Sequence, residues 1–313
     1  MPGKTKLDAG YEHLNTDRST TLPAFSDAGT FYRYDNPEST TDDTVYLGLK
    51  NSSLDWLTAK IKYTRLDRDS DINLTNVLPE AQPIYTARFD ALGKTMDEWK
   101  LGFELYPSER LDLCLEFKHQ QHDYDENNSS RTDEERQSVY VDITWRAFQT
   151  VTLNGFVGFE TTEIDANKRL SIGARPNEIP LLGPSRVETT DDDFWTYGLA
   201  ANIKATDKLA FKVSWQHQES DGTLNFTSLD GSDTFVNITE ADDYTKKILE
   251  AKAIYAIDPK LKMTLGYLYE KLKYSDINYA DYVNVVGSSF YSGLYADPNY
   301  EANVGYLMVS YGF

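Results

Sequence analysis

Apolar and polar residues alternate along most of this chain in runs of about eight to twelve residues. The segment 111–118 is typical: its odd-numbered residues are apolar, and its even-numbered residues include Asp112, Glu116 and Lys118. Successive side chains of a strand point to opposite faces, so this alternation predicts β-strands with one apolar face each. The same alternation recurs in 57–63, 99–105, 139–145, 195–203, 209–215 and 261–269.

The connections between the predicted strands alternate between two length classes. Five are short, and they lie at Asn51–Asp55, Tyr106–Arg110, Arg146–Thr150, Lys204–Lys208 and Ile257–Lys260. Long polar stretches lie between them, at 15–42, 67–96, 123–136, 162–192, 220–242 and 273–301. Up-and-down barrels of bacterial outer membranes have tight periplasmic turns and long outer loops. The sequence therefore predicts an all-β protein, a transmembrane up-and-down antiparallel β-barrel with about twelve strands in this chain, as a single domain over 1–313.

Strand length separates this fold from a soluble sandwich. Alternation alone fits both, because a sandwich buries the same apolar face against a second sheet. Runs of eight to twelve residues are long enough for a tilted strand to cross the hydrocarbon layer, whereas soluble strands average about five to six. The opposite face is polar or small, which suits a wet or protein-filled lumen. Length and loop rhythm together favour the membrane barrel.

The end of the chain carries a separate signal. Leu307, Val309, Tyr311 and Phe313 alternate with polar or small residues and Met308, and Phe313 is the last residue. This pattern resembles the C-terminal insertion signal that the outer-membrane assembly machinery reads by strand addition. It predicts a bacterial outer-membrane location. Twelve strands that begin at the periplasm also end there, so we expect periplasmic termini and extracellular long loops.

Charge excludes one class of partner. The formal net charge is −19, and nucleic-acid binding requires clustered Lys and Arg. Acidic runs such as Asp191–Asp193 and Asp133–Glu135 fall in the long connections, where we expect solvated loop surface. Tyrosine is abundant, with 22 residues, as expected for aromatic girdles at the two membrane interfaces.

No motif for chemistry is found in the sequence. Cys114 is the single cysteine, and no Cys-x-x-Cys-His occurs, so this chain attaches no c-type haem itself. No Gly-x-Ser-x-Gly, P-loop or dinucleotide fingerprint is present. The four histidines, His13, His119, His122 and His217, are expected at strand ends, and His119 and His122 on opposite faces. We therefore predict a protein that is not an enzyme, with no catalytic, metal-binding or cofactor-binding residues.

Several stretches of this chain resemble the MtrB/PioB family of decahaem-associated outer-membrane proteins. They are KLDAGYEH (6–13), LKNSSLDWLTAKIKY (49–63), RFD (88–90), LYPSERLDL (105–113), HDYD (122–125), LGYLYEK (265–271) and YLMVSYGF (306–313). The resemblance covers nearly all of this chain, but only about the C-terminal half of the family. It implies that the chain is the C-terminal part of a longer family architecture.

The resemblance also implies a function. Family members form a large barrel that sheathes a periplasm-side multihaem c-type cytochrome and often docks another outside, so that electrons cross the outer membrane. The haem belongs to the partner, and the barrel keeps the charged cytochrome away from hydrocarbon. From strand parity, we expect the following lumen-facing residues to touch the cytochrome: Lys60, Lys62, Lys100, Glu104, Glu116, Lys118, Lys212, Lys252 and Lys262.

Barrel width leaves an alternative open. Barrel diameter grows with strand number, and twelve strands alone would enclose a lumen too narrow for a multihaem cytochrome. Either these strands belong to a larger barrel, or they close alone as a porin-like passive aqueous channel, general or substrate-selective. The first interpretation predicts a haem-protein partner, and the second predicts ion conductance from the isolated chain.

Overall fold

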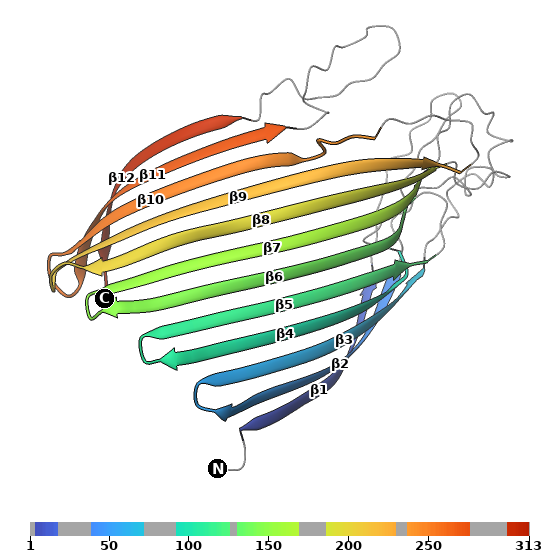
Figure 1. The fold of residues 1–313 in the computed structure, drawn as a ribbon, viewed down its shortest axis with the longest axis horizontal. Coiled ribbons are helices and arrows are strands. Elements are labelled where there is room, and N and C mark those ends of the chain that lie inside the picture. Colours follow the sequence, from blue (N-terminus) through green and yellow to red (C-terminus); the bar gives the residue numbers. More distant parts are fainter. Residues whose placement is uncertain are drawn as a thin grey trace, which may run out of the picture.

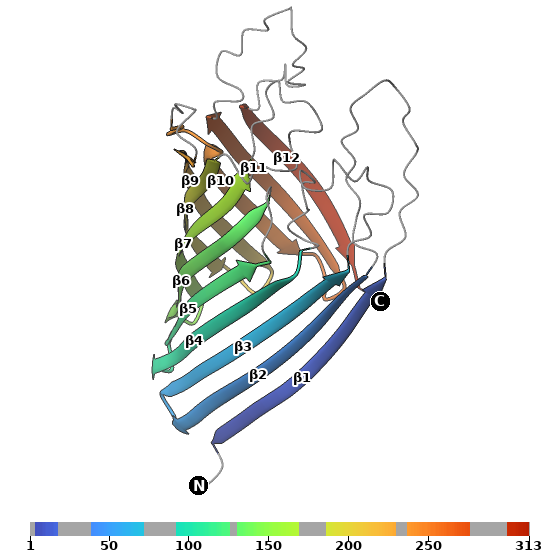
Figure 2. The same cartoon turned by 90° about the vertical axis from the view of Figure 1, so that its right-hand side faces the viewer.

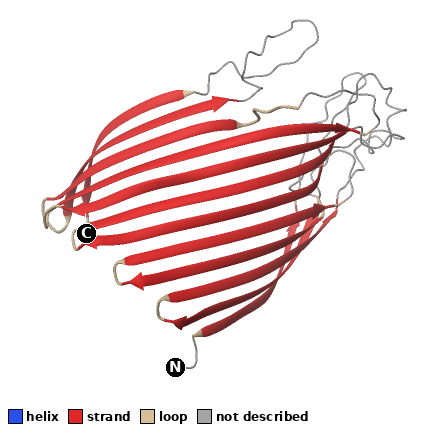
Figure 3. Cartoon of the chain, in the orientation of Figure 1, coloured by secondary structure: helices blue, strands red, loops and turns tan. Residues whose placement is uncertain are grey.

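The computed structural model describes residues 4–17, 39–71, 92–125, 130–168, 186–229, 237–275 and 299–312. These residues form one antiparallel sheet of twelve strands, in which every strand pairs with its neighbours along the chain (Figures 1 and 3). The strands are β1 (Thr5–Asp17), β2 (Ser39–Leu54), β3 (Leu57–Asp71), β4 (Lys94–Ser108), β5 (Leu111–Tyr124), β6 (Arg131–Phe148), β7 (Val151–Lys168), β8 (Arg186–Lys204), β9 (Leu209–Ser228), β10 (Asp243–Ala256), β11 (Leu261–Ser275) and β12 (Tyr300–Tyr311). The predicted strand number and antiparallel order are confirmed.

No helix in the described ranges is long and apolar enough to cross a membrane.

All five short connections lie at one end of the sheet, as the sequence predicts (Figure 1). Side chains stabilise these turns by accepting backbone hydrogen bonds. Thr206 Oγ1 accepts from Leu209 N at 3.0 Å, and Asp258 Oδ1 accepts from Lys260 N at 2.8 Å. Residues with short polar side chains therefore stabilise the chain reversal in these two hairpins.

The strands reach farther from these turns than the sequence predicts. β8 has 19 residues and β9 has 20, against a predicted length of about eight to twelve. The acidic runs Asp191–Asp193 and Asp133–Glu135, expected in loops, lie inside β8 and β6. Both faces meet water beyond the lipid, so polar residues on both faces are compatible with a paired strand. The central parts of the long connections lie outside the described residues.

The sheet is strongly curved, and β1 and β12 are its two edges (Figures 1 and 2). Its polar face is the concave one, because side chains converge there across an intervening strand. The rings of Phe194 on β8 and Tyr244 on β10 lie 6.3 Å apart, over β9. Tyr306 on β12 donates a hydrogen bond of 3.3 Å to Glu250 on β10, over β11. We call this concave face the inner face and the convex face the outer face. Within the described residues β1 and β12 do not pair, so the sheet is an open arc.

The outer face carries a continuous belt of exposed apolar side chains. Among the described residues, the buried hydrophobic side chains are only Leu92, Tyr124, Ala147 and Ala166, so no second sheet covers this face as a sandwich would. On β8 the outward apolar positions run from Trp195 to Ile203, about the nine to eleven residues of a tilted membrane strand. Members of the belt are Leu47, Leu49, Ile61, Phe103, Leu115, Val139, Ile143, Val157, Leu199, Phe211, Val213, Met263, Leu265 and Leu307.

Aromatic side chains mark both borders of the belt. At the border far from the short turns they form pairs on adjacent strands: Tyr63 with Trp99, with ring centroids 4.7 Å apart, and Phe159 with Trp195, 4.3 Å apart. At the turn-side border the exposed aromatics include Trp145, Phe148, Tyr255 and Tyr311. Such girdles are expected where amphipathic rings meet the headgroups of both leaflets.

Candidate functional site

The inner face carries all of the charged residues predicted to line the lumen. Residues that oppose each other directly on neighbouring strands share a face, and so do residues separated by two or four positions on one strand. By these two relations the inner face includes Lys60, Lys62, Lys100, Glu104, Glu116, Lys118, Lys212, Lys252 and Lys262. The residues on β3 to β5 form one group, and the three lysines on β9 to β11 form another. Their contact with a cytochrome stays a prediction.

Three inner-face lysines have a carboxylate of their own. Lys60 pairs with Glu104, Lys252 with Glu250 at 2.7 Å, and Lys246 with Glu270 at 3.1 Å. Glu98 on β4 pairs with Lys100 at 3.1 Å and lies 3.9 Å from Lys118. Because the Lys60–Glu104 and Lys252–Glu250 pairs line a concave surface within the span of the apolar belt, the wall is suited to water or a polar partner and unsuited to lipid.

A cluster of charged residues lies at the end of the inner face that is far from the short turns. The carboxylate of Glu134 on β6 accepts from Tyr124 Oη at 2.9 Å, Arg131 Nη1 at 2.6 Å and Arg136 Nε at 2.5 Å. Glu134 is only 4% exposed, so its charge depends on these donors in place of water. We call Tyr124, Arg131, Glu134 and Arg136 the rim cluster.

Further polar pairs extend the rim cluster toward β2. Arg68 makes a bidentate contact with Asp42, through Nε and Nη2, each at 2.6 Å. Lys94 Nζ lies 3.3 Å from His122 Nδ1. These residues lie on the strand extensions beyond the apolar belt. There, burial, with Lys94 as the second cause, lowers the pKa of His122 to about 4, so the ring is neutral at pH 7 and accepts from Lys94.

Sequence reasoning missed Glu98 and the rim cluster. Both can be predicted if the alternation of inner-face and outer-face positions is continued past the last apolar residue of each strand. Glu134 and Arg136 are two apart, and so are Glu98 and Lys100, so each pair shares a face of its strand. The missing information was how far β5 and β6 continue.

Close packing on the inner face leaves no space for a side chain at Gly198 of β8. A Cβ there would lie 2.7 Å from Phe156 Cε1 and 2.7 Å from the carbonyl oxygen of Trp215. We expect Gly198→Val to lower the free energy of unfolding by about 1–3 kcal/mol, because the ring and the backbone must both move. Urea titration of the folded protein, followed by tryptophan fluorescence, measures this.

Gly102→Val is the matched control for Gly198→Val. Gly102 lies on the same face of β4, and a Cβ there meets only the Lys60 side chain, at 3.7 Å. Valine also favours strands, so we expect the Gly102 variant to stay within about 0.5 kcal/mol of the wild type. Equal losses in both variants would show that the packing at Gly198 is not tight.

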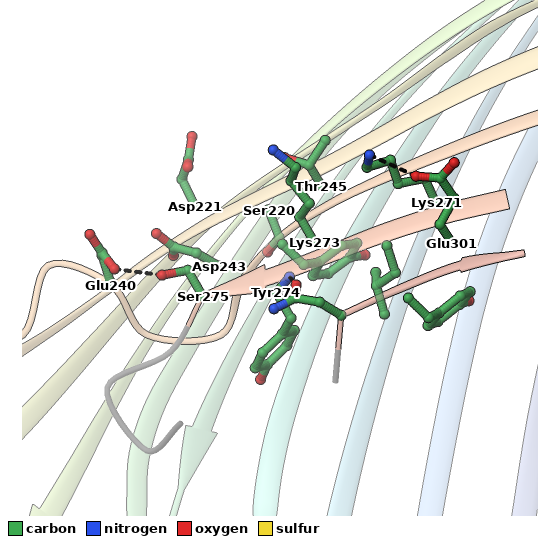
Figure 4. A pocket seen from close by; sticks show the side chains of 14 residues that line it. Ser220, Asp221, Glu240, Asp243, Thr245, Lys271, Lys273, Tyr274, Ser275 and Glu301 are labelled. Carbon is green, nitrogen blue, oxygen red and sulfur yellow. Dashed lines mark hydrogen bonds and ion pairs between the residues drawn. The ribbon is translucent and has the colours of Figure 1, made fainter. Parts of the chain in front are cut away.

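A hollow of about 680 Å³ lies between the ends of β10, β11 and β12 that are far from the short turns (Figure 4). Its lining side chains contact one another: Lys271 Nζ pairs with Glu301 at 2.9 Å, and Ser275 Oγ donates to Glu240 at 2.6 Å (Figure 4). Within the seven described ranges, no group of three or more His, Cys, Asp or Glu side chains is placed to hold a metal ion. The lining of the hollow therefore includes charged and polar side chains that form hydrogen bonds with one another.

The histidines differ from the sequence expectation in one respect. His119 and His122 lie on opposite faces of β5, as predicted, opposing Trp99 and Met96. His217 lies inside β9, not at its end, and its ring centroid is 4.9 Å from that of Tyr197 on the outer face. The strand-end prediction for His217 was wrong, because β9 continues for eleven residues beyond it.

The predicted insertion signal lies on the edge strand β12. Leu307, Val309 and Tyr311 share its outer face and oppose Leu265, Met263 and Leu261 of β11 in that order. Phe313 lies outside the described residues. Recognition of this strand by the assembly machinery stays a prediction.

A curved antiparallel sheet with an outer apolar belt, two aromatic girdles and a charged inner wall defines an outer-membrane β-barrel protein. The family described as "Putative outer membrane beta-barrel porin, MtrB/PioB" matches residues 1–313. The chain belongs to the MtrB/PioB family, as the sequence resemblance implied. No curated protein matches the chain.

Solved outer-membrane proteins share the fold. A ferric enterobactin receptor mutant (PfeA, G324V) from Pseudomonas aeruginosa matches with a TM-score of 0.56 and 11% identity, over 75% of this chain and 37% of its own. The copper transporter OprC matches with a TM-score of 0.56 and 9% identity, over 97% and 42%. The siderophore receptor PiuA from Acinetobacter baumannii matches with 0.50 and 10%, over 99% and 46%. This chain therefore spans less than half the length of each of these three structures.

Proposed function

We propose that this chain forms part of the wall of an outer-membrane barrel that sheathes a multihaem c-type cytochrome, in a conduit that carries electrons across the outer membrane. The observation that carries the proposal is the open arc: twelve strands curve around a charged concave face without their edges meeting. Lumen width grows with strand number, and 22-stranded barrels enclose a lumen wide enough for a protein plug. An arc that does not close by itself, and that covers less than half the length of the solved structures PfeA and OprC, fits a lumen wider than twelve strands alone enclose.

The charged inner wall supports a protein occupant. Hydrocarbon cannot solvate the polar shell of a cytochrome, so a haem protein crosses the membrane only inside a polar sleeve. Membership of the MtrB/PioB family implies such a partner, and this chain supplies the wall with no haem motif of its own. In this arrangement the short turns and the termini lie in the periplasm, and the long connections lie outside the cell.

The presence of haem tests this function. We expect the chain, purified from native outer membranes in mild detergent, to carry c-type haem absorbance at about one cytochrome per barrel, because a sleeve and its occupant copurify. A parallel purification from cells that lack the chain controls for loosely bound cytochrome.

A passive channel is the second candidate function, and the porin description of the family favours it. It predicts a colourless barrel that conducts ions in a planar bilayer, because an unoccupied polar lumen fills with water. That result would overturn the cytochrome sheath and support the porin.

A further inference from the structure

Three lysines on adjacent strands lie directly opposite one another on the inner face. Lys62 of β3 opposes Lys100 of β4, which in turn opposes Lys118 of β5. We call these three residues the lysine row. Directly opposed residues of an antiparallel pair have Cβ atoms about 5 Å apart, where like charges destabilise the sheet.

The row has too few carboxylates to balance its charge. Glu98 is shared by Lys100, at 3.1 Å, and Lys118, at 3.9 Å. The ammonium group of Lys62 lies over the ring of Tyr46, 4.5 Å from its centroid, and pairs with no carboxylate among the described residues. The side chains of Lys100 and Lys118 are 42% and 31% exposed, so both remain accessible from the lumen.

Three other lysines of the inner face are balanced individually. Lys60, Lys246 and Lys252, elsewhere on the same face, each pair with a separate carboxylate. The whole chain carries a formal charge of −19, so unbalanced positive charge at one place is not a consequence of composition. An anionic partner that binds the row relieves its internal repulsion, which gives the contact more free energy than a balanced surface would offer.

The position of the lysine row along β3 and β4 indicates that its partner lies in the lumen. Lys62 and Lys100 are adjacent in sequence to Tyr63 and Trp99, whose rings pair on the outer face at the border of the apolar belt. The row therefore lies on the concave side of the wall, at the level of this border of the membrane-spanning part.

We propose that the lysine row is a docking surface for acidic side chains, Asp and Glu, on the haem protein that fills the lumen. This inference rests on the proposed sheath function. It adds that the sleeve and its occupant are held in register by charge at the level of β3 to β5, by ion pairs that salt weakens.

The test compares two triple variants that remove the same charge. K62Q/K100Q/K118Q removes the row, and K247Q/K271Q/K273Q removes three lysines from the outer face of β10 and β11. Each full-length chain is purified from native outer membranes, and the ratio of haem absorbance to barrel protein is recorded in washes from about 0.15 M to about 1 M NaCl. Mobility on unheated gels confirms that both variants are folded.

We expect the wild type and the outer-face variant to retain haem at about 0.15 M NaCl and to lose it as salt rises. The row variant is expected to retain about tenfold less haem at low salt, as the loss of three modest ion pairs implies, with a flatter salt dependence. Equal retention in all three proteins would overturn the docking row and leave the sheath in place. A wild type without haem would overturn the sheath and the docking row together.

Discussion

The substitution Leu199→Arg is expected to lower the free energy of unfolding in a lipid bilayer by about 2–4 kcal/mol. Leu199 lies near the middle of the apolar belt on the outer face of β8, and it is 65% exposed in the absence of lipid. A guanidinium group there must enter the hydrocarbon or distort the bilayer around it. Urea titration in phospholipid vesicles, followed by tryptophan fluorescence, measures the loss.

The adjacent residue is the control for Leu199→Arg. Ala200 lies on the inner face, between Asn154 of β7 and Ser214 of β9. Its substitution by arginine adds the same charge one residue away but directs it toward the polar lumen, so we expect a change within about 1 kcal/mol. If Ala200→Arg were the more damaging variant, the assignment of lipid and lumen faces would be reversed.

The substitution Glu134→Gln is expected to lower the free energy of unfolding by about 2–3 kcal/mol. The variant keeps the shape of Glu134 but leaves Arg131 and Arg136 facing a neutral amide in a buried position. Breaking a buried ion pair costs about 3–5 kcal/mol, and the cost here is smaller because Arg136 is 42% exposed and keeps part of its hydration. The same urea titration reports the change.

Glu135→Gln makes the same chemical change at the neighbouring residue. Glu135 is on the outer face of β6, where it lies 3.8 Å from His119 and is well exposed. Exposed ion pairs contribute about 0–1 kcal/mol, so we expect little effect. Similar losses in the two variants would show that the rim cluster contributes no more than ordinary surface charge.

These two pairs of variants separate the forces on the two faces of one wall. Leu199 depends on the lipid outside, whereas Glu134 depends on donors supplied by β5 and β6 inside. The haem measurements then ask what the inner face binds. Because stability and haem content are measured separately, loss of haem from a protein that remains stable can be assigned to a change in binding and not to misfolding.

Local pattern was enough to predict the strands that cross the lipid. In β5, Leu111 to Phe117 alternate with Asp112, Glu116 and Lys118, because lipid on one side and a polar lumen on the other impose opposite demands on successive residues. The turns were equally predictable, because short connections such as Lys204–Lys208 and Ile257–Lys260 separate consecutive alternating runs. In the structure, Thr206 and Asp258 accept backbone hydrogen bonds within these two turns.

The same reasoning failed where the environment is polar on both sides. Beyond the belt, residues such as Asp191 and Asp192 occupy successive positions of β8, so no alternation distinguishes strand from loop. The rim cluster lies in that region, and its partners come from β5 and β6.

The amino-acid pattern was therefore sufficient to predict the membrane-crossing parts of the strands, their order and which lysines share the inner face, because alternation and connection length are local properties. Which residues oppose one another across neighbouring strands could be known only from the folded sheet. Alternation repeats every two residues, so a shift of a strand by two positions preserves both faces but changes every cross-strand neighbour. The alignment of Lys62, Lys100 and Lys118, the convergence of donors on Glu134 and the curvature of the arc all depend on that register.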